Sequence, residues 1–157
     1  SILEQLEKNN CSYLIVGGLA VVLHGRARLT TDIDLIIALD KENCLKVLNC
    51  LEELGFKSRI PVNPKNFADA NIRRNWIEEK GLTVMSFYSE NDPLISVDLF
   101  VEHPLDYAEM QKRAVYKDLG EINVLVASID DIIELKKISG RPKDLDDIEA
   151  LELIKNG

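Results

Sequence analysis

Long hydrophobic runs are missing from this chain, and so is any surplus of basic residues. Apolar stretches such as Leu35–Leu39 fall far short of the roughly 20 residues that cross a membrane. Residues Ile2–Lys8 lack the basic segment followed by an apolar one that marks a signal peptide. The formal net charge of −8 disfavours a broad nucleic-acid-binding surface. We therefore expect a cytoplasmic protein without membrane contact and without strong non-specific binding to nucleic acid.

Cysteine and histidine are also scarce. The cysteines are odd in number and form no C-x-x-C pair, and neither histidine has a second histidine or cysteine at ligand spacing. We expect reduced thiols that lie mostly in the core, and no structural zinc site. The residues concerned are Cys11, Cys44, Cys50, His24 and His103.

What the chain does contain is typical of one globular domain. It has 157 residues, of which 46% are hydrophobic and 29% charged. Strand and helix patterns alternate, with antiparallel strand pairs late in the chain, which predicts an α/β (α+β) fold with a mixed sheet flanked by helices. We expect residues 1–157 to form a single domain, with the C-terminal helices 128–155 packed on it.

Periodicity and turn residues place the individual elements. The helices are predicted at 2–8, 18–25, between Asp40 and Gly55, at 106–112, 128–139 and 143–154, with a helical or irregular segment at 66–80. The strands are predicted at 12–16, 33–38, 56–62, 82–88, 95–101, 114–118 and 122–126.

The segment 13–37 contains two features that point to chemistry. An apolar strand ends at Gly17-Gly18, where a helix begins, and such a turn offers backbone N–H groups to phosphate. The second feature is the pair Asp32 and Asp34. Because residues two apart in a strand share a face, their carboxylates would lie side by side, about 6–7 Å apart along the strand. Paired carboxylates favour a hard cation such as Mg²⁺.

A third carboxylate, Asp98, lies in the middle of the apolar strand 95–101. An unpaired carboxylate there would be costly to bury, so Asp98 must meet a cation or lie on an open face. If its strand neighbours that of Asp34, three acidic groups can gather around one or two Mg²⁺ ions. Such an arrangement serves phosphoryl or nucleotidyl transfer.

Taken together, these residues resemble the nucleotidyltransferase superfamily with the DNA polymerase β-type fold. The resemblance rests on Gly17-Gly18, on Asp32-Ile-Asp34 and on Asp98 in a later strand. The chain is more closely similar to minimal prokaryotic members related to AbiEii-type toxins. The similarity to these members extends over Gly17–Ala20, Arg28–Asp34 and Leu135–Asp147.

The resemblance implies transfer of an NMP from an NTP to a hydroxyl acceptor, with two Mg²⁺ ions when NTP is bound. The acceptor would be an RNA end, a protein side chain or a small molecule. Asp32, Asp34 and Asp98 would be catalytic and bind metal, with Asp98 as the third ligand or the base. Gly17 and Gly18 would hold the triphosphate. Many active members carry Gly-Ser at this point, together with a further helical domain, and this chain departs from both features.

Four more residues complete the predicted nucleotide site, each with an ordinary alternative. Arg28 suits bidentate phosphate binding but could be a solvated loop charge. Thr30 could simply favour a strand. Lys136 and Arg141 could reach the triphosphate, or they could belong to a salt-bridged helix corner.

Two other functions remain open from the sequence. One is a non-catalytic nucleotide-binding or protein-interaction module, such as one half of a toxin–antitoxin pair, acting with a protein partner or as a homodimer. The other is a metal-dependent phosphohydrolase.

Overall fold

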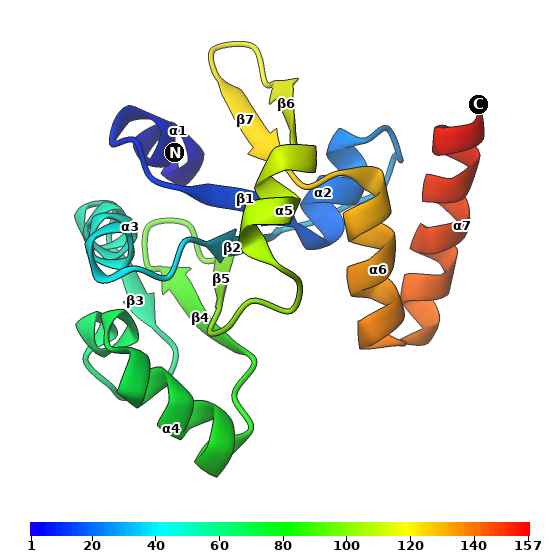
Figure 1. Ribbon diagram of the computed structural model, residues 1–157. Helices are drawn as coiled ribbons and strands as arrows, with labels where there is room; N and C mark the ends of the chain where they lie inside the picture. Colours follow the sequence, from blue (N-terminus) through cyan, green and yellow to red (C-terminus); the bar gives the residue numbers. More distant parts are fainter.

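The computed structural model describes residues 1–157 and contains one mixed sheet of seven strands (Figure 1). The strand order is β3-β4-β5-β2-β1-β7-β6. The pairs β2–β5 and β1–β7 are parallel, and the other neighbours are antiparallel. The predicted α/β class with a mixed, helix-flanked sheet is confirmed. The strands are β1 (Tyr13–Val16), β2 (Asp32–Ile37), β3 (Phe56–Ser58), β4 (Val84–Ser89), β5 (Ser96–Phe100), β6 (Val115–Asp118) and β7 (Asn123–Val126).

The helices form two groups at opposite ends of the sheet, with α5 between them in the view of Figure 1. One group contains α1, α3, the 3-10 helix η1 and α4, and the other contains α2, α6 and α7. None of the helices combines the length and the hydrophobicity that spanning a membrane requires. The helices are α1 (Ile2–Lys8), α2 (Gly17–Leu23), α3 (Lys41–Glu53), η1 (Pro64–Ala68), α4 (Ala70–Lys80), α5 (Tyr107–Arg113), α6 (Ile129–Ser139) and α7 (Pro142–Asn156).

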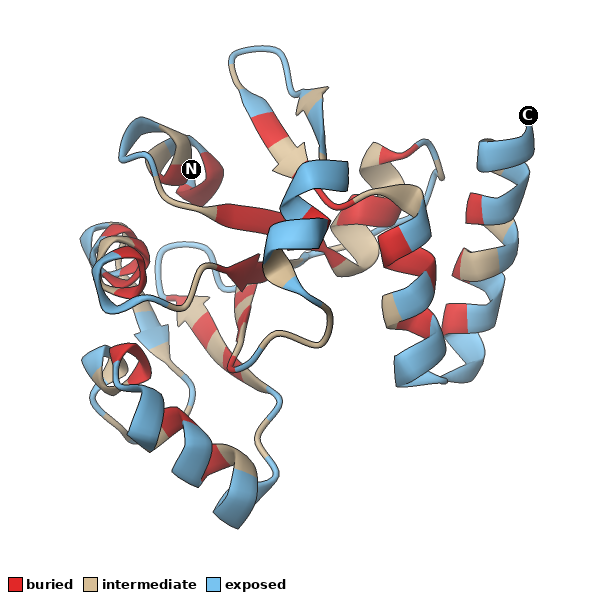
Figure 2. Cartoon of the chain, viewed as in Figure 1, coloured by how far each residue is buried: buried red, intermediate tan, exposed pale blue.

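The core follows the central strands, and Figure 2 shows buried residues along β1, β2, β5 and the inner faces of the helices. All four residues of β1 are buried, as expected for a strand covered on both faces. In β4 and β5 buried residues alternate with partly exposed ones, so these strands keep one face accessible. Asp98 lies on the accessible face of β5.

Two predicted elements differ from the structure. The strand predicted at 56–62 stops at Ser58, because the Ser58 hydroxyl bonds to the backbone of Ile60 and closes a turn. The segment 66–80 divides into η1 and α4, because the Asp69 side chain accepts the N–H groups of Asn71 and Ile72 and starts a new helix.

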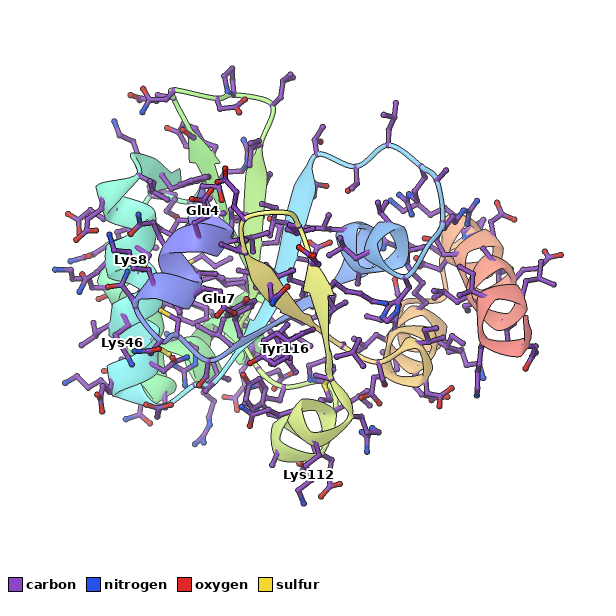
Figure 3. All side chains as sticks on the ribbon, turned by 90° about the horizontal axis from the view of Figure 1, so that it is seen from above. Glu4, Glu7, Lys8, Lys46, Lys112 and Tyr116 are labelled. Atoms are coloured by element: carbon purple, nitrogen blue, oxygen red, sulfur yellow. The ribbon has the colours of Figure 1, made fainter.

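Two cationic or polar side chains near the surface bind backbone carbonyls. Of the basic pair at 73–74, Arg73 is buried and donates to the carbonyls of Phe67 and Leu39, so it is unavailable to a ligand. His103 bonds to the Ile37 carbonyl and is half-buried. The charged side chains labelled on α1 and α3 in Figure 3 lie on the side of the molecule away from α6 and α7.

Candidate functional site

Three neighbouring strands bring two carboxylates together in the sheet. Strand β2 lies between β1, to which it is antiparallel, and β5, to which it is parallel. In this register Asp34 stands opposite Val16 on one side and Asp98 on the other. Because residues in register point to the same face of a sheet, the two carboxylates lie side by side. The strand of Asp98 is thus the neighbour of the strand of Asp34, as the three-carboxylate hypothesis required.

The backbone turn after β1 touches the Asp34 carboxylate. Gly17 has a φ of +68°, in the left-handed region. A Cβ atom built at this position would lie only 2.0 Å from Asp34 Oδ2. Glycine alone admits both this backbone conformation and this close approach. Gly17 therefore allows Asp34 to pack against the main chain where α2 begins.

The carboxyl group of Asp34 is strongly perturbed. Burial raises its pKa, the neighbouring Asp98 and Asp32 raise it further, to about 7, and Lys136 opposes this rise. The protein therefore holds more negative charge at this point than its own cations offset. Two adjacent oxygen donors with uncompensated charge suit a hard divalent cation.

Asp32 lies farther out, at the exposed start of β2 and in register with Ser96. No three acidic, histidine or cysteine side chains converge in a geometry that could hold a metal ion. Mg²⁺ often uses only one or two carboxylates and takes its other ligands from water and substrate phosphate. Asp34 and Asp98 therefore fit such an ion, and Asp32 as a third ligand stays a prediction.

Two side chains occupy the space beside Gly18. A Cβ atom on Gly18 would lie 3.1 Å from Thr30 Oγ1 and 3.4 Å from Arg28 Nη2. Thr30 thus presents a hydroxyl next to a glycine that has no side chain of its own. The structure brings these three residues together, and their contact with a nucleotide stays a prediction.

The corner between α6 and α7 is a buried ion-pair cluster. Lys136 Nζ lies 3.2 Å from Asp144 Oδ1 and 2.9 Å from Asp147 Oδ2, and all three side chains are less than 10% exposed. Arg141 Nε lies 3.0 Å from Asp144 Oδ2, while its side chain remains 58% exposed. The salt-bridged corner left open by the sequence is therefore present. Arg141 remains free to approach a ligand.

A cavity of about 630 Å³ connects the carboxylate pair with this corner. Its volume lies within the range of small-molecule sites, roughly 300–1,000 Å³. The strand side carries carboxylates and apolar groups, and the helical side carries Lys136 and Arg141. The residues that line it include Gly17, Asp34, Val84, Asp98, Phe100, Glu102, Ile132, Leu135, Lys136, Ile138, Arg141 and Asp144.

The ion pairs of the cluster at the helix corner can be tested by measuring how the stability of the protein changes at acid pH. Burial raises the pKa of Asp144, but hydrogen bonds from Arg141 and Lys136 outweigh burial and lower the pKa from 3.8 to about 2. A carboxylate with a lowered folded-state pKa stabilises the protein above pH 4 and loses this contribution as the pH falls towards 2. We expect Asp144→Asn to lower the free energy of unfolding at pH 7 by about 2 kcal/mol.

Urea unfolding at pH 7 and pH 3 measures this difference, which should shrink at the lower pH. Asp130→Asn is the control, because Asp130 forms an exposed ion pair with Lys155 at 2.6 Å. An exposed pair contributes at most about 1 kcal/mol. Equal effects of the two substitutions would show that the buried cluster contributes no more than a surface pair.

Sequence reasoning missed two features of the site. Asp147 binds Arg26 and Arg28 as well as Lys136, so α7 is tied to the loop that follows α2. The only signal was the acidic residue itself, because Arg26 and Arg28 lie more than a hundred positions earlier in the chain. Glu102 lines the cavity just after β5, and no motif marked it.

Comparison with known protein families identifies the family of this chain. Residues 1–156 match the family described as "Nucleotidyltransferase of unknown function (DUF6036)". The chain belongs to this family. Among curated protein sequences, none matches the chain.

Solved structures show that this family member shares its fold with nucleotidyltransferases. The lincosamide antibiotic adenylyltransferase LnuA, solved with lincomycin, has a TM-score of 0.63 and 20% identity over 98% of this chain and 93% of its own. ANT(2")-Ia, solved with adenylyl-2"-tobramycin, has a TM-score of 0.61 and 16% identity over 98% of this chain and 88% of its own. An antigenic nucleotidyltransferase-like protein from Paracoccidioides brasiliensis has a TM-score of 0.60 and 18% identity over 96% of this chain and 71% of its own.

Proposed function

We propose that this family member transfers an NMP from an NTP to a hydroxyl group of a small-molecule acceptor, in a reaction that depends on Mg²⁺. The observation that carries the proposal is the pairing of Asp34 with Asp98 at the wall of a cavity whose helical side contains Lys136 and Arg141. Family membership supports the reaction class. The volume of the cavity and the antibiotics named with two proteins of this fold support a small acceptor.

The basic side of the cavity supports a triphosphate in that position. Around the corner between α6 and α7, four cationic side chains share two carboxylates, so two positive charges remain for a ligand, and two of these cations line the cavity. This local surplus, in a chain with a net charge of −8, favours a polyanion. The four cations are Arg26, Arg28, Lys136 and Arg141, and the carboxylates are Asp144 and Asp147.

The residues around the turn would divide the remaining work. Gly17 and Gly18 would receive the phosphates on the backbone, and Thr30 would supply the hydroxyl that Gly18 lacks. Asp34 and Asp98, with Asp32 nearby, would hold Mg²⁺. When bound, this ion would neutralise phosphate charge and align the reacting oxygens.

The proposed transfer forms one phosphorus–oxygen bond and breaks another. The acceptor oxygen attacks the α-phosphorus, and the bond from this phosphorus to the bridging oxygen of the β-phosphate breaks. Pyrophosphate leaves and carries the electron pair of the broken bond. Asp98 would take the proton from the attacking hydroxyl, because its carboxylate lies at the cavity wall.

A transfer assay with each α-labelled NTP, Mg²⁺ and pools of small molecules, RNA or cell extract tests the proposal. We expect wild-type protein to label a small molecule. The double variant Asp32→Ala/Asp34→Ala should lose about 10³-fold or more of this activity. Asp146→Ala, at an exposed position on α7, is the control and should retain it.

The other outcomes separate the competing functions. Label on RNA or protein would support nucleotidyl transfer but contradict the small-molecule acceptor. NTP turnover without any labelled acceptor would establish the phosphohydrolase. NTP binding without turnover would favour the non-catalytic module, and neither binding nor transfer would refute the proposal.

A further inference from the structure

One buried carboxylate on the C-terminal helix binds three cationic side chains. Asp147 Oδ1 lies 2.6 Å from Arg26 Nη1, and Asp147 Oδ2 lies 2.6 Å from Arg28 Nη1 and 2.9 Å from Lys136 Nζ. The Asp147 side chain is 2% exposed, whereas those of Arg26 and Arg28 are about 30% exposed. A single carboxylate thus fixes side chains from α6 and from the loop after α2.

Two of these cations also face the candidate site. The second amino group of Arg28, Nη2, lies 3.4 Å from the position of a Cβ atom on Gly18. Lys136 lines the cavity that contains Asp34 and Asp98, and it is close enough to affect the Asp34 carboxyl group. Asp147 itself does not line the cavity, so it binds these two cations without occupying the space that a ligand would take.

The contacts of Asp147 differ from those of an ordinary structural ion pair. Asp147 binds three cations and shares only one of them, Lys136, with a second carboxylate, Asp144, so mutual repulsion of the cations opposes the arrangement. A dianionic or more highly charged ligand on the open side would relieve this repulsion. The cluster is therefore arranged for a polyphosphate to complete.

We propose that Asp147 is a positioning residue of the nucleotide site, which holds Arg28 and Lys136 in the arrangement that binds the polyphosphate. The proposal rests on the proposed function for the identity of the ligand. It makes α7 part of the nucleotide site, although Asp147 itself touches no substrate. In Figure 1 α7 lies beside α6, and α6 packs on α2, so α7 is close to the elements that form the site.

The sign of the effect distinguishes positioning from simple electrostatics. Asp147→Asn removes one negative charge near the ligand, so electrostatics alone predicts tighter binding of an anion. Positioning predicts weaker binding, because Arg28 and Lys136 lose the group that orients them. Asp146→Asn makes the same charge change at the adjacent exposed position of α7 and is the matched control.

Calorimetric titration with inorganic tripolyphosphate, at a temperature where circular dichroism shows all variants folded, measures the effect. We expect the dissociation constant of Asp147→Asn to rise about 10-fold, as for the loss of a bidentate phosphate contact. Asp146→Asn should stay within about 2-fold of wild type. In the transfer assay the KM for NTP should rise in Asp147→Asn while kcat changes much less.

Asp147→Glu keeps the charge and the ion pairs needed for folding, but its longer side chain shifts the cations. It should also bind tripolyphosphate more weakly than wild type, which keeps the proposal testable if Asp147→Asn does not fold. Unchanged or tighter binding in a folded Asp147 variant would overturn the positioning role while leaving the proposed function intact. If wild-type protein binds neither tripolyphosphate nor NTP, the proposed function fails together with this inference.

Discussion

Gly17→Ala is expected to lower transfer activity by about 10²-fold or more and the free energy of unfolding by about 2–4 kcal/mol. The backbone of residue 17 has a φ of +68°, which alanine adopts only at a cost. In addition, the new methyl group would lie 2.0 Å from Asp34 Oδ2, so the carboxylate must move. Displacing Asp34 separates it from Asp98 and breaks the pair on which the proposed reaction depends.

Gly18→Ala is the control for the effect on stability. Its Cβ atom would meet Thr30 Oγ1 at 3.1 Å and Arg28 Nη2 at 3.4 Å, and both are side-chain ends that can give way. Its backbone lies outside the left-handed region, so we expect a stability change within about 1 kcal/mol. Urea unfolding should be measured for both variants, and kcat/KM for Gly17→Ala against wild type. Equal losses of unfolding free energy in the two variants would show that Asp34 does not depend on the Gly17 turn.

Asp98→Asn is expected to stabilise the metal-free protein and at the same time to abolish transfer. Asp34 and Asp98 lie side by side, and the amide of an asparagine would replace a repulsion with a hydrogen bond. We expect the free energy of unfolding at pH 8 to rise by about 1–2 kcal/mol. For a chain of this length that corresponds to an increase in Tm of roughly 3–6 °C. Transfer should fall about 10³-fold, because a proton acceptor and metal ligand is lost.

The pH dependence of stability follows from the same pair. The folded-state pKa of Asp34 is raised from 3.8 to about 7 by burial, Asp98 and Asp32. The folded protein therefore holds this proton more tightly, and stability falls as the pH rises from about 4 to 7. Asp98→Asn should reduce this fall, and added Mg²⁺ should stabilise wild type more than the variant.

Thermal unfolding with chelator at pH 5.5 and pH 8, and then with Mg²⁺, measures these differences. Asp92→Asn removes an exposed loop carboxylate and should leave Tm and activity unchanged. A lower Tm for Asp98→Asn at pH 8 would contradict the prediction. It would mean that Asp98 stabilises its surroundings, for example through the Ser96 hydroxyl that it accepts at 3.4 Å.

Local patterns in the sequence predicted most of the elements. The helix predicted at 2–8 matches α1, and the strand pattern at 12–16 contains β1, because apolar spacing directly reflects which faces are buried. Errors arose where a side chain overrides the pattern. The Ser58 turn ends β3 early, and the Asp69 cap begins α4, and neither contact is visible as a periodicity.

For the site, the sequence located single residues better than their partners. Gly17 and Asp34 stood out by spacing, and Asp98 stood out as a carboxylate in an apolar strand. Their contact could be stated only as a condition, because it requires β5 to pair with β2 across a long stretch of chain. The links from Asp147 to Arg26 and Arg28 were not foreseen at all, because they depend on how α7 docks.

By itself, the sequence determined the class of fold, the turn at Gly17-Gly18 and the acidic residues Asp32 and Asp34, because backbone sterics and side-chain periodicity act between near neighbours. Only the tertiary structure decided that Asp34 meets Asp98 and that one carboxylate of α7 binds three cations. Strand order and helix docking come from burying the whole core at once, and no local pattern encodes them.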